Sequence, residues 1–244
     1  LITFNTKSDF FINLFFGFIV ISLIITFIHF FLKINFLISI SIFLFGIIIF
    51  FRKKKNSIFF FKKNLLLYSI VIFLLLPIFI SQKYHEDFGY YHLPYSLAFI
   101  EEKIVFGFAN INIPYVYNSI WLNLFPIFFI ENKNFNFLTL PSFLLFLSFI
   151  IFSIKNIIEK KDQIKNSDYY LIVILFYFLL KFTRISEFGV DFPAIIFSVL
   201  SIYYFIKFYE TKENLDKKSF FYFNLFFAIF AILIKLSAAL IIIL

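Results

Sequence analysis

The chain has 244 residues, of which 62% are hydrophobic, 25% aromatic and 15% charged. A soluble domain is nearer half apolar and a quarter charged, so this composition excludes an ordinary soluble enzyme. The formal net charge is +8 and there is no cysteine, which excludes disulfides, thiolate metal ligands and cysteine nucleophiles. The composition predicts a protein that lies in a lipid bilayer.

Apolar segments predict an all-α, polytopic transmembrane bundle of about seven spans. A helix needs about 20 predominantly apolar residues to cross a bilayer, and somewhat fewer in a thin one. The segments expected to span are 10–32, 34–51, 64–80, 137–154, 169–183, 193–208 and 220–244. The last is cut while still apolar and the chain does not begin with Met, so we expect an internal fragment of a longer polytopic protein.

The distribution of lysine and arginine predicts the orientation of the chain, because short cytoplasmic loops concentrate these residues. Basic clusters lie within 52–63, 155–165 and 207–218, and all three can be cytoplasmic only if 81–136 makes no net crossing. The apolar stretch 114–130, which is rich in proline and polar residues, is therefore expected to be an outer juxtamembrane helix rather than a span. The basic excess acts as an insertion signal, and we expect no nucleic-acid partner.

This topology places the N-terminus in the cytoplasm and the acidic loops 81–136 and 184–192 outside. Three regions follow from it. Residues 1–63 form a transmembrane hairpin with a basic cytoplasmic loop, 64–208 form a core that includes the outer loop, and 209–244 form a cytoplasmic loop and a truncated final helix.

The first polar cluster, Tyr84–His92, directly follows the third expected span. It places two adjacent carboxylates, Glu86 and Asp87, between two His and three Tyr residues. A carboxylate at the mouth of a lipid-facing cavity loses water and becomes a stronger base, which suits general-base catalysis. The alternative is an interfacial belt in which Tyr and His sit among headgroups and both acids are simply solvated.

The second polar cluster occupies the short outer loop before the sixth span. Glu187 and Asp191 lie four residues apart, so a helical turn or a folded loop brings them together. Such a pair can hold Mg²⁺ or Mn²⁺, while Lys181 and Arg184 are free to meet a phosphate. The alternative is a tight loop with Gly189 in the turn and a proline starting the next helix.

A third group of polar residues lies in and near the expected juxtamembrane helix. Asn118, Trp121 and Asn123 there can contact sugar hydroxyls and a lipid chain, although anchors and caps have the same composition. Two isolated residues remain. His29 lies at the outer end of the first span, and Lys235 lies within the last, where a cation is costly unless it is paired.

These residues carry a resemblance to the GT-C superfamily of polytopic glycosyltransferases. In the bacterial branch related to the protein O-mannosyltransferases, the first outer loop begins Asp-Glu-x-Tyr-Tyr. The sequence 87–91 matches the Asp and the Tyr pair, with Phe88 at the second acid, and Glu86 lies before the Asp rather than after it. The segments 107–111, 118–121 and 184–191 are also similar to this superfamily, and the resemblance covers roughly 64–208.

The resemblance implies an inverting sugar transfer from a polyprenyl-phosphate-linked donor to a glycan, lipid or protein acceptor at the outer face of a bacterial inner membrane. Asp87 would be the general base, with Glu86 as the other catalytic carboxylate. Glu187 and Asp191 would bind a metal ion, if one is used. The substrate-binding residues would be His85, Tyr90, Tyr91, His92, Asn118, Trp121, Lys181 and Arg184.

Two other interpretations stay open. A transporter or flippase of lipid-linked saccharides would place ionisable residues near mid-membrane, whereas the acids here lie outside the expected spans, seven of the 14 of them at the outer surface, and only Lys235 is deep. A non-enzymatic membrane scaffold would tolerate neutralisation of both acidic clusters.

Overall fold

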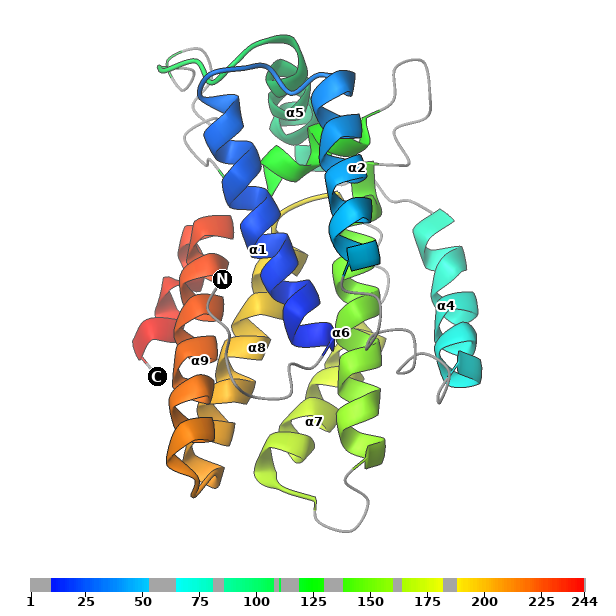
Figure 1. Ribbon diagram of the computed structural model, residues 1–244, viewed down its shortest axis with the longest axis vertical. Coiled ribbons are helices and arrows are strands. Elements are labelled where there is room, and N and C mark those ends of the chain that lie inside the picture. The colour runs from blue at the N-terminus through cyan, green and yellow to red at the C-terminus, as the bar shows by residue number, and fades with distance from the viewer. Residues whose placement is uncertain are drawn as a thin grey trace. The chain divides into compact units, whose positions relative to one another are not determined.

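The computed structural model describes residues 10–52, 65–80, 86–107, 110, 119–129, 138–159, 164–181 and 188–243. These residues are α-helical for the most part, with short π- and 3₁₀-helical turns and no strand among them (Figure 1). The expectation of an all-α protein is therefore confirmed for the part of the chain that the structure describes.

Each of the seven apolar segments contains an α-helix. Four helices are long and apolar enough to cross a membrane: α1 (Phe10–His29), α6 (Leu140–Glu159), α8 (Asp191–Glu210) and α9 (Asn214–Ile234). Three more are apolar but shorter: α2 (Phe36–Arg52), α4 (Leu65–Ile80) and α7 (Asn166–Leu180). These helices indicate a membrane protein, whereas the count of seven spans remains a prediction.

Exposed side chains on the shorter helices agree with a lipid environment. On α4, Leu66 and Phe73 are 77% and 76% exposed, and on α2 Leu37 is 71% exposed. Apolar faces of this extent are rare on proteins surrounded by water and normal on helices surrounded by hydrocarbon.

The chain divides into two compact units. Unit 1 comprises Leu1–Ile19, Leu144–Ile185 and Val190–Leu244, and unit 2 comprises Val20–Phe143 with Ser186–Gly189. The second outer loop is thus divided, because Phe188 and Gly189 belong to unit 2 whereas Asp191 belongs to unit 1.

In unit 1, α8 and α9 form a closely packed antiparallel pair (Figure 1). The Ser201 hydroxyl donates to Asn224 Oδ1 at 2.5 Å across this pair, and Tyr203 donates to Asn156 Oδ1 of α6 at 3.2 Å. Aromatic edges fill the spaces between helices, as where Phe152 meets Tyr203 with ring centroids 5.5 Å apart. Interhelical hydrogen bonds and close packing are what hold helices together in lipid, where the hydrophobic effect does not act between them.

The last segment departs from the expected span of 220–244. Helix α9 ends at Ile234, Lys235 is its C-cap with an extended backbone, and the chain continues as the 3₁₀ helix η7 (Leu236–Ile243), which packs against α9 and α8. The apolar run at the end of the sequence is therefore a broken helix rather than one continuous span.

Unit 2 contains the second half of α1 together with α2 and α4, followed by the π-helical turn η1 (Phe88–His92), α5 (Leu93–Glu101) and the 3₁₀ helix η4 (Leu122–Phe128). The expected juxtamembrane helix at 114–130 is only partly described. Its described part is a 3₁₀ helix with Pro126 inside, and all six residues from Leu122 to Ile127 are buried. This part is therefore a core element of unit 2 that packs against α5 and α2, not a helix lying on a surface.

Candidate functional site

The first acidic cluster begins a continuous helical segment. Glu86 and Asp87 precede η1, in which the Leu93 amide donates to the Phe88 carbonyl, and α5 follows directly. The wider π turn changes which residues face inward: Phe88 and His92 are buried, Asp87 is half-buried, and Glu86 is exposed. Single π turns inside helices are frequent at functional sites because they re-aim the side chains around them.

The tyrosines of this segment differ in their surroundings. Tyr90 is 62% exposed, Tyr91 is half-buried against the His92 ring at 4.2 Å between centroids, and Tyr95 of α5 is buried beside Phe99. Burial raises the pKa of Tyr95 to about 12. Its hydroxyl therefore stays protonated at physiological pH and cannot act as a base.

The second outer loop lies directly against this segment within unit 2. The Phe188 ring is 2% exposed, and its centroid lies 5.1 Å from that of Phe88, 6.0 Å from that of His92 and 4.1 Å from that of Phe125 in η4. A Cβ added to Gly189 would lie 3.6 Å from His92 Cε1. Three segments far apart in sequence therefore meet around Phe188, and two of them are the motifs that the sequence singled out.

Trp121 does not face outward as expected for a sugar- or lipid-contacting residue. Its side chain is fully buried, and the indole Nε1 donates to Ser142 Oγ at 3.1 Å. With both ring faces buried in unit 2, it can support the site only by packing. Asn118, the other binding residue expected in this segment, lies outside the described residues.

A buried polar seam on α1 was not recognised as part of the site from the sequence. Thr26 accepts from Asn123 Nδ2 at 2.6 Å and donates to the Ser22 carbonyl at 2.8 Å. His29 is fully buried, and its Nε2 donates to the Glu102 carbonyl at 3.0 Å. Residues 22, 26 and 29 follow the i, i+4, i+7 spacing of one helix face, which is the signal that could have identified the seam. These bonds hold the outer end of α1 to η4 and to the end of α5.

Lys235 has a partner that the sequence could not reveal. Its Nζ forms an ion pair with Asp191 Oδ1 at 2.5 Å, and the two side chains are 41% and 64% exposed. Asp191 is the first residue of α8, where a negative charge is also favoured by the helix dipole. An otherwise costly cation at the break after α9 is thus neutralised.

The same pair bears on the expected metal site. Asp191 is committed to Lys235, Glu187 lies outside the described residues, and no group of three or more His, Asp or Glu gathers in the described ranges. Mg²⁺ and Mn²⁺ prefer several oxygen ligands, so the metal site at Glu187 and Asp191 stays a prediction that the described residues do not test.

Three candidate residues remain, and one of them is among the described residues. Lys181 is the exposed C-cap of α7 in unit 1, and its amide donates to the Tyr177 carbonyl at 3.1 Å. His85 and Arg184 lie outside the described residues.

The comparison with known proteins gives a family without an activity. The model of a domain of unknown function, DUF8201, matches residues 1–244. The chain belongs to this family. No curated protein and no solved structure matches it. The function of this DUF8201 chain is therefore argued from its own residues, because an architecture alone does not determine an activity.

Proposed function

We propose that the protein is an integral-membrane glycosyltransferase of the GT-C type. It transfers a sugar, with inversion, from a polyprenyl-phosphate-linked donor to an acceptor on the outer face of a bacterial inner membrane. The observation that carries the proposal is the packing of Phe188 and Gly189 against Phe88 and His92. An active site built from two outer loops requires such a meeting, whereas two independent interfacial belts do not.

Asp87 is the general base of the proposed reaction. Its carboxylate accepts the proton of the acceptor hydroxyl while that oxygen attacks the anomeric carbon from the face opposite the leaving group. The bond from the anomeric carbon to the phosphate oxygen breaks, and polyprenyl phosphate departs with the bonding electron pair. Asp87 suits this role better than Glu86, because it is half-buried at the start of η1 while Glu86 is exposed.

Binding of the two substrates is assigned to the residues around the Phe188 cluster. Tyr90 is exposed and offers a ring face and a hydroxyl, and Tyr91 and His92 continue the same segment. The resemblance assigns the positive charge for the departing phosphate to Lys181 and Arg184, and a developing anion gains most from donors that are already in place. Trp121 supports the site from the core of unit 2.

The test compares two adjacent carboxylates in the intact protein. Asp87→Asn keeps the size of the side chain and removes the base, so transfer from a lipid-linked sugar should fall by at least about 100-fold, the usual contribution of a general base. Glu86→Gln is the matched control and should keep transfer within a few-fold. Membrane insertion, measured by the detergent-extracted yield, should be unchanged in both.

Normal transfer by Asp87→Asn would remove Asp87 as the base. Loss of transfer in Glu86→Gln with normal transfer in Asp87→Asn would move the role to Glu86. Absence of transfer from any lipid-linked sugar, with a correctly inserted wild-type chain, would remove the glycosyltransferase proposal itself.

One observation favours the alternative of a transporter or flippase. The break at Lys235 between α9 and η7 resembles the interrupted helices that transporters use at their substrate sites. That alternative expects ion-dependent uptake or flipping of a lipid-linked saccharide in vesicles that survives Asp87→Asn.

A further inference from the structure

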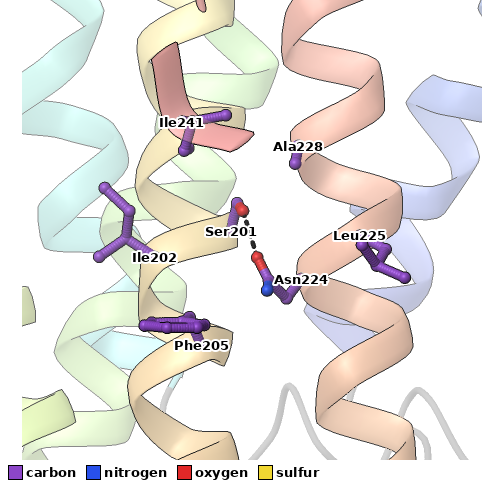
Figure 2. Close-up of a pocket in the computed structure, with 7 residues that line it drawn as sticks. All are labelled: Ser201, Ile202, Phe205, Asn224, Leu225, Ala228 and Ile241. Atoms are coloured by element: carbon purple, nitrogen blue, oxygen red, sulfur yellow. Dashed lines mark hydrogen bonds between the residues drawn. The ribbon is translucent and has the colours of Figure 1, made fainter. Parts of the chain in front are cut away.

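Unit 1 contains a groove between α8, α9 and η7 that the proposed reaction does not use. It is a cavity of about 90 Å³ lined by Ser201, Ile202, Phe205, Asn224, Leu225, Ala228 and Ile241. Figure 2 shows Ser201 and Asn224 facing each other across the groove, with Ile241 of η7 and Ala228 on one side of them and Phe205 on the other. The walls are apolar apart from this one hydrogen-bonded pair.

The groove lies at the middle of two candidate spans. Ser201 lies ten residues after Asp191 along α8, and Asn224 lies eleven residues before Lys235 along α9. At 1.5 Å per residue the floor of the groove is about 15 Å from the Asp191–Lys235 pair along both helices. That distance is half the thickness of a hydrocarbon core, so with the Asp191–Lys235 pair at the headgroup level the groove lies at the depth of the lipid tails.

Side chains next to the groove leave its mouth uncovered by the described residues. Leu225, which lines it, is 40% exposed, and Ile229 and Leu233 on α9 are 52% and 46% exposed. An apolar depression at this depth stabilises a hydrocarbon chain through close contact, as any apolar cavity does for an apolar guest.

Two lysine side chains lie at the end of unit 1 through which a lipid chain would enter the groove. Lys235 begins the turn into η7, and one of its three ammonium donors is taken by Asp191. The exposed Lys181 ends α7 at the same end, since Phe178 of α7 packs on Phe192 of α8 with centroids 5.0 Å apart. Together Lys181, Lys235 and Asp191 carry a net charge of +1.

From this arrangement we infer that unit 1 binds an anionic lipid, with its phosphate headgroup at Lys235 and its chain in the groove between α8, α9 and η7. An ammonium group at the headgroup level and an apolar groove about 15 Å deeper are the two halves of a site for such an amphiphile. The binding stands on the residues of unit 1. Only the identification of this lipid with the sugar donor rests on the proposed function.

Substitution of the two members of the Asp191–Lys235 ion pair should have different effects on lipid binding. Asp191 competes with a phosphate for the Lys235 ammonium, so Asp191→Asn should leave the affinity for an anionic lipid unchanged or raise it. Lys235→Gln removes the cation and should lower the affinity about tenfold. If the pair were only structural, both substitutions would weaken binding to a similar extent.

A second pair of measurements tests the groove. Ala228→Phe fills the cavity, so it should weaken binding of a long-chain polyprenyl phosphate several-fold while leaving geranyl phosphate unaffected, because the short chain does not reach the groove. Binding is measured by equilibrium displacement on the purified intact protein in nanodiscs, with inorganic phosphate as the headgroup-only probe. Thermal unfolding of each variant confirms that it is folded, and if Lys235→Gln unfolds, Ala228→Phe and Asp191→Asn decide the matter.

Equal binding of polyprenyl phosphate by wild type, Lys235→Gln and Ala228→Phe would overturn the inference, and so would parallel losses in Lys235→Gln and Asp191→Asn. Equal displacement by phosphatidylglycerol would keep the anionic-lipid site and overturn its assignment to the sugar donor. Groove- and Lys235-dependent binding without any sugar transfer would support the site while removing the proposed function. Transfer that depends on Asp87 but not on Lys235 would support the proposed function while removing the lipid site at Lys235.

Discussion

At the scale of single residues, Gly189 is a position where the second loop lies against the first. A Cβ there meets the His92 ring, with Cε1 at 3.6 Å and Nδ1 at 3.9 Å, which are ordinary contact distances, so a methyl group fits whereas a larger side chain is expected to press on the ring. The packing of His92, which is buried, depends on this space.

We therefore expect Gly189→Ala to keep most of the transfer activity and Gly189→Leu to lose it, with membrane insertion unchanged in both. The leucine displaces His92 and with it the segment that begins at Asp87. The measurement is transfer rate against detergent-extracted yield. Equal activity in the two variants would show that the contact between the loops has no role in the site.

The sequence predicted those properties of single residues that depend on local chemistry alone. The cost of a cation in a hydrophobic segment predicted that Lys235 needs a partner. The identity of that partner, Asp191, could not be predicted, because the two residues are 44 positions apart and meet only through the packing of α8 and α9. The burial of Trp121 was missed for the same reason, since its surroundings include Ser142 of α6.

At the scale of the elements, the start of α7 is held by a residue from the end of α8. Glu210 Oε1 accepts from the Ser167 amide at 2.9 Å, and Oε2 accepts from the Ser167 hydroxyl at 2.7 Å. Asp168 Oδ2 also accepts from the Lys165 amide at 3.1 Å. Amide groups in the first turn of a helix lack helical partners, so these carboxylates complete them.

Glu210→Ala should destabilise unit 1 by about 1–2 kcal/mol, because it removes two charge-assisted hydrogen bonds from a partly buried site. Glu213→Ala is the control. That side chain is exposed and makes no cap bond to α9, so its loss should stay within about 0.5 kcal/mol. Hydrogen exchange at the first turn of α7 measures both effects. Equal protection in the two variants would mean that Glu210 does not hold α7.

Apolar periodicity predicted the existence of the helices but not the way the last one ends. The run from 220 to 244 contains no proline or glycine, so the sequence carries no local stop signal. Helix α9 nevertheless ends at Lys235, where the ammonium meets Asp191 and η7 packs against α8 and α9. In 114–130 tertiary packing also overrode the expected outcome, because the described residues are buried in unit 2 rather than spread on a surface.

At the scale of the whole molecule, the proposed site belongs to a protein whose helices face lipid. The described helices include four that are long enough to cross a membrane, and the basic residues predict which ends face the cytoplasm. The proposed site requires that the first acidic cluster and the second outer loop share a compartment, which is the central claim.

The absence of cysteine in this chain allows the claim to be measured directly by single-cysteine labelling of the intact protein. Three exposed positions serve: Tyr90 beside the first cluster, Lys181 at the start of the second loop, and Leu215 at the start of α9, which is 81% exposed. A membrane-impermeant maleimide added outside should label Tyr90→Cys and Lys181→Cys, and should label Leu215→Cys only after permeabilisation. Labelling of positions 90 and 181 from opposite sides of the membrane would contradict the shared site and the proposed reaction with it.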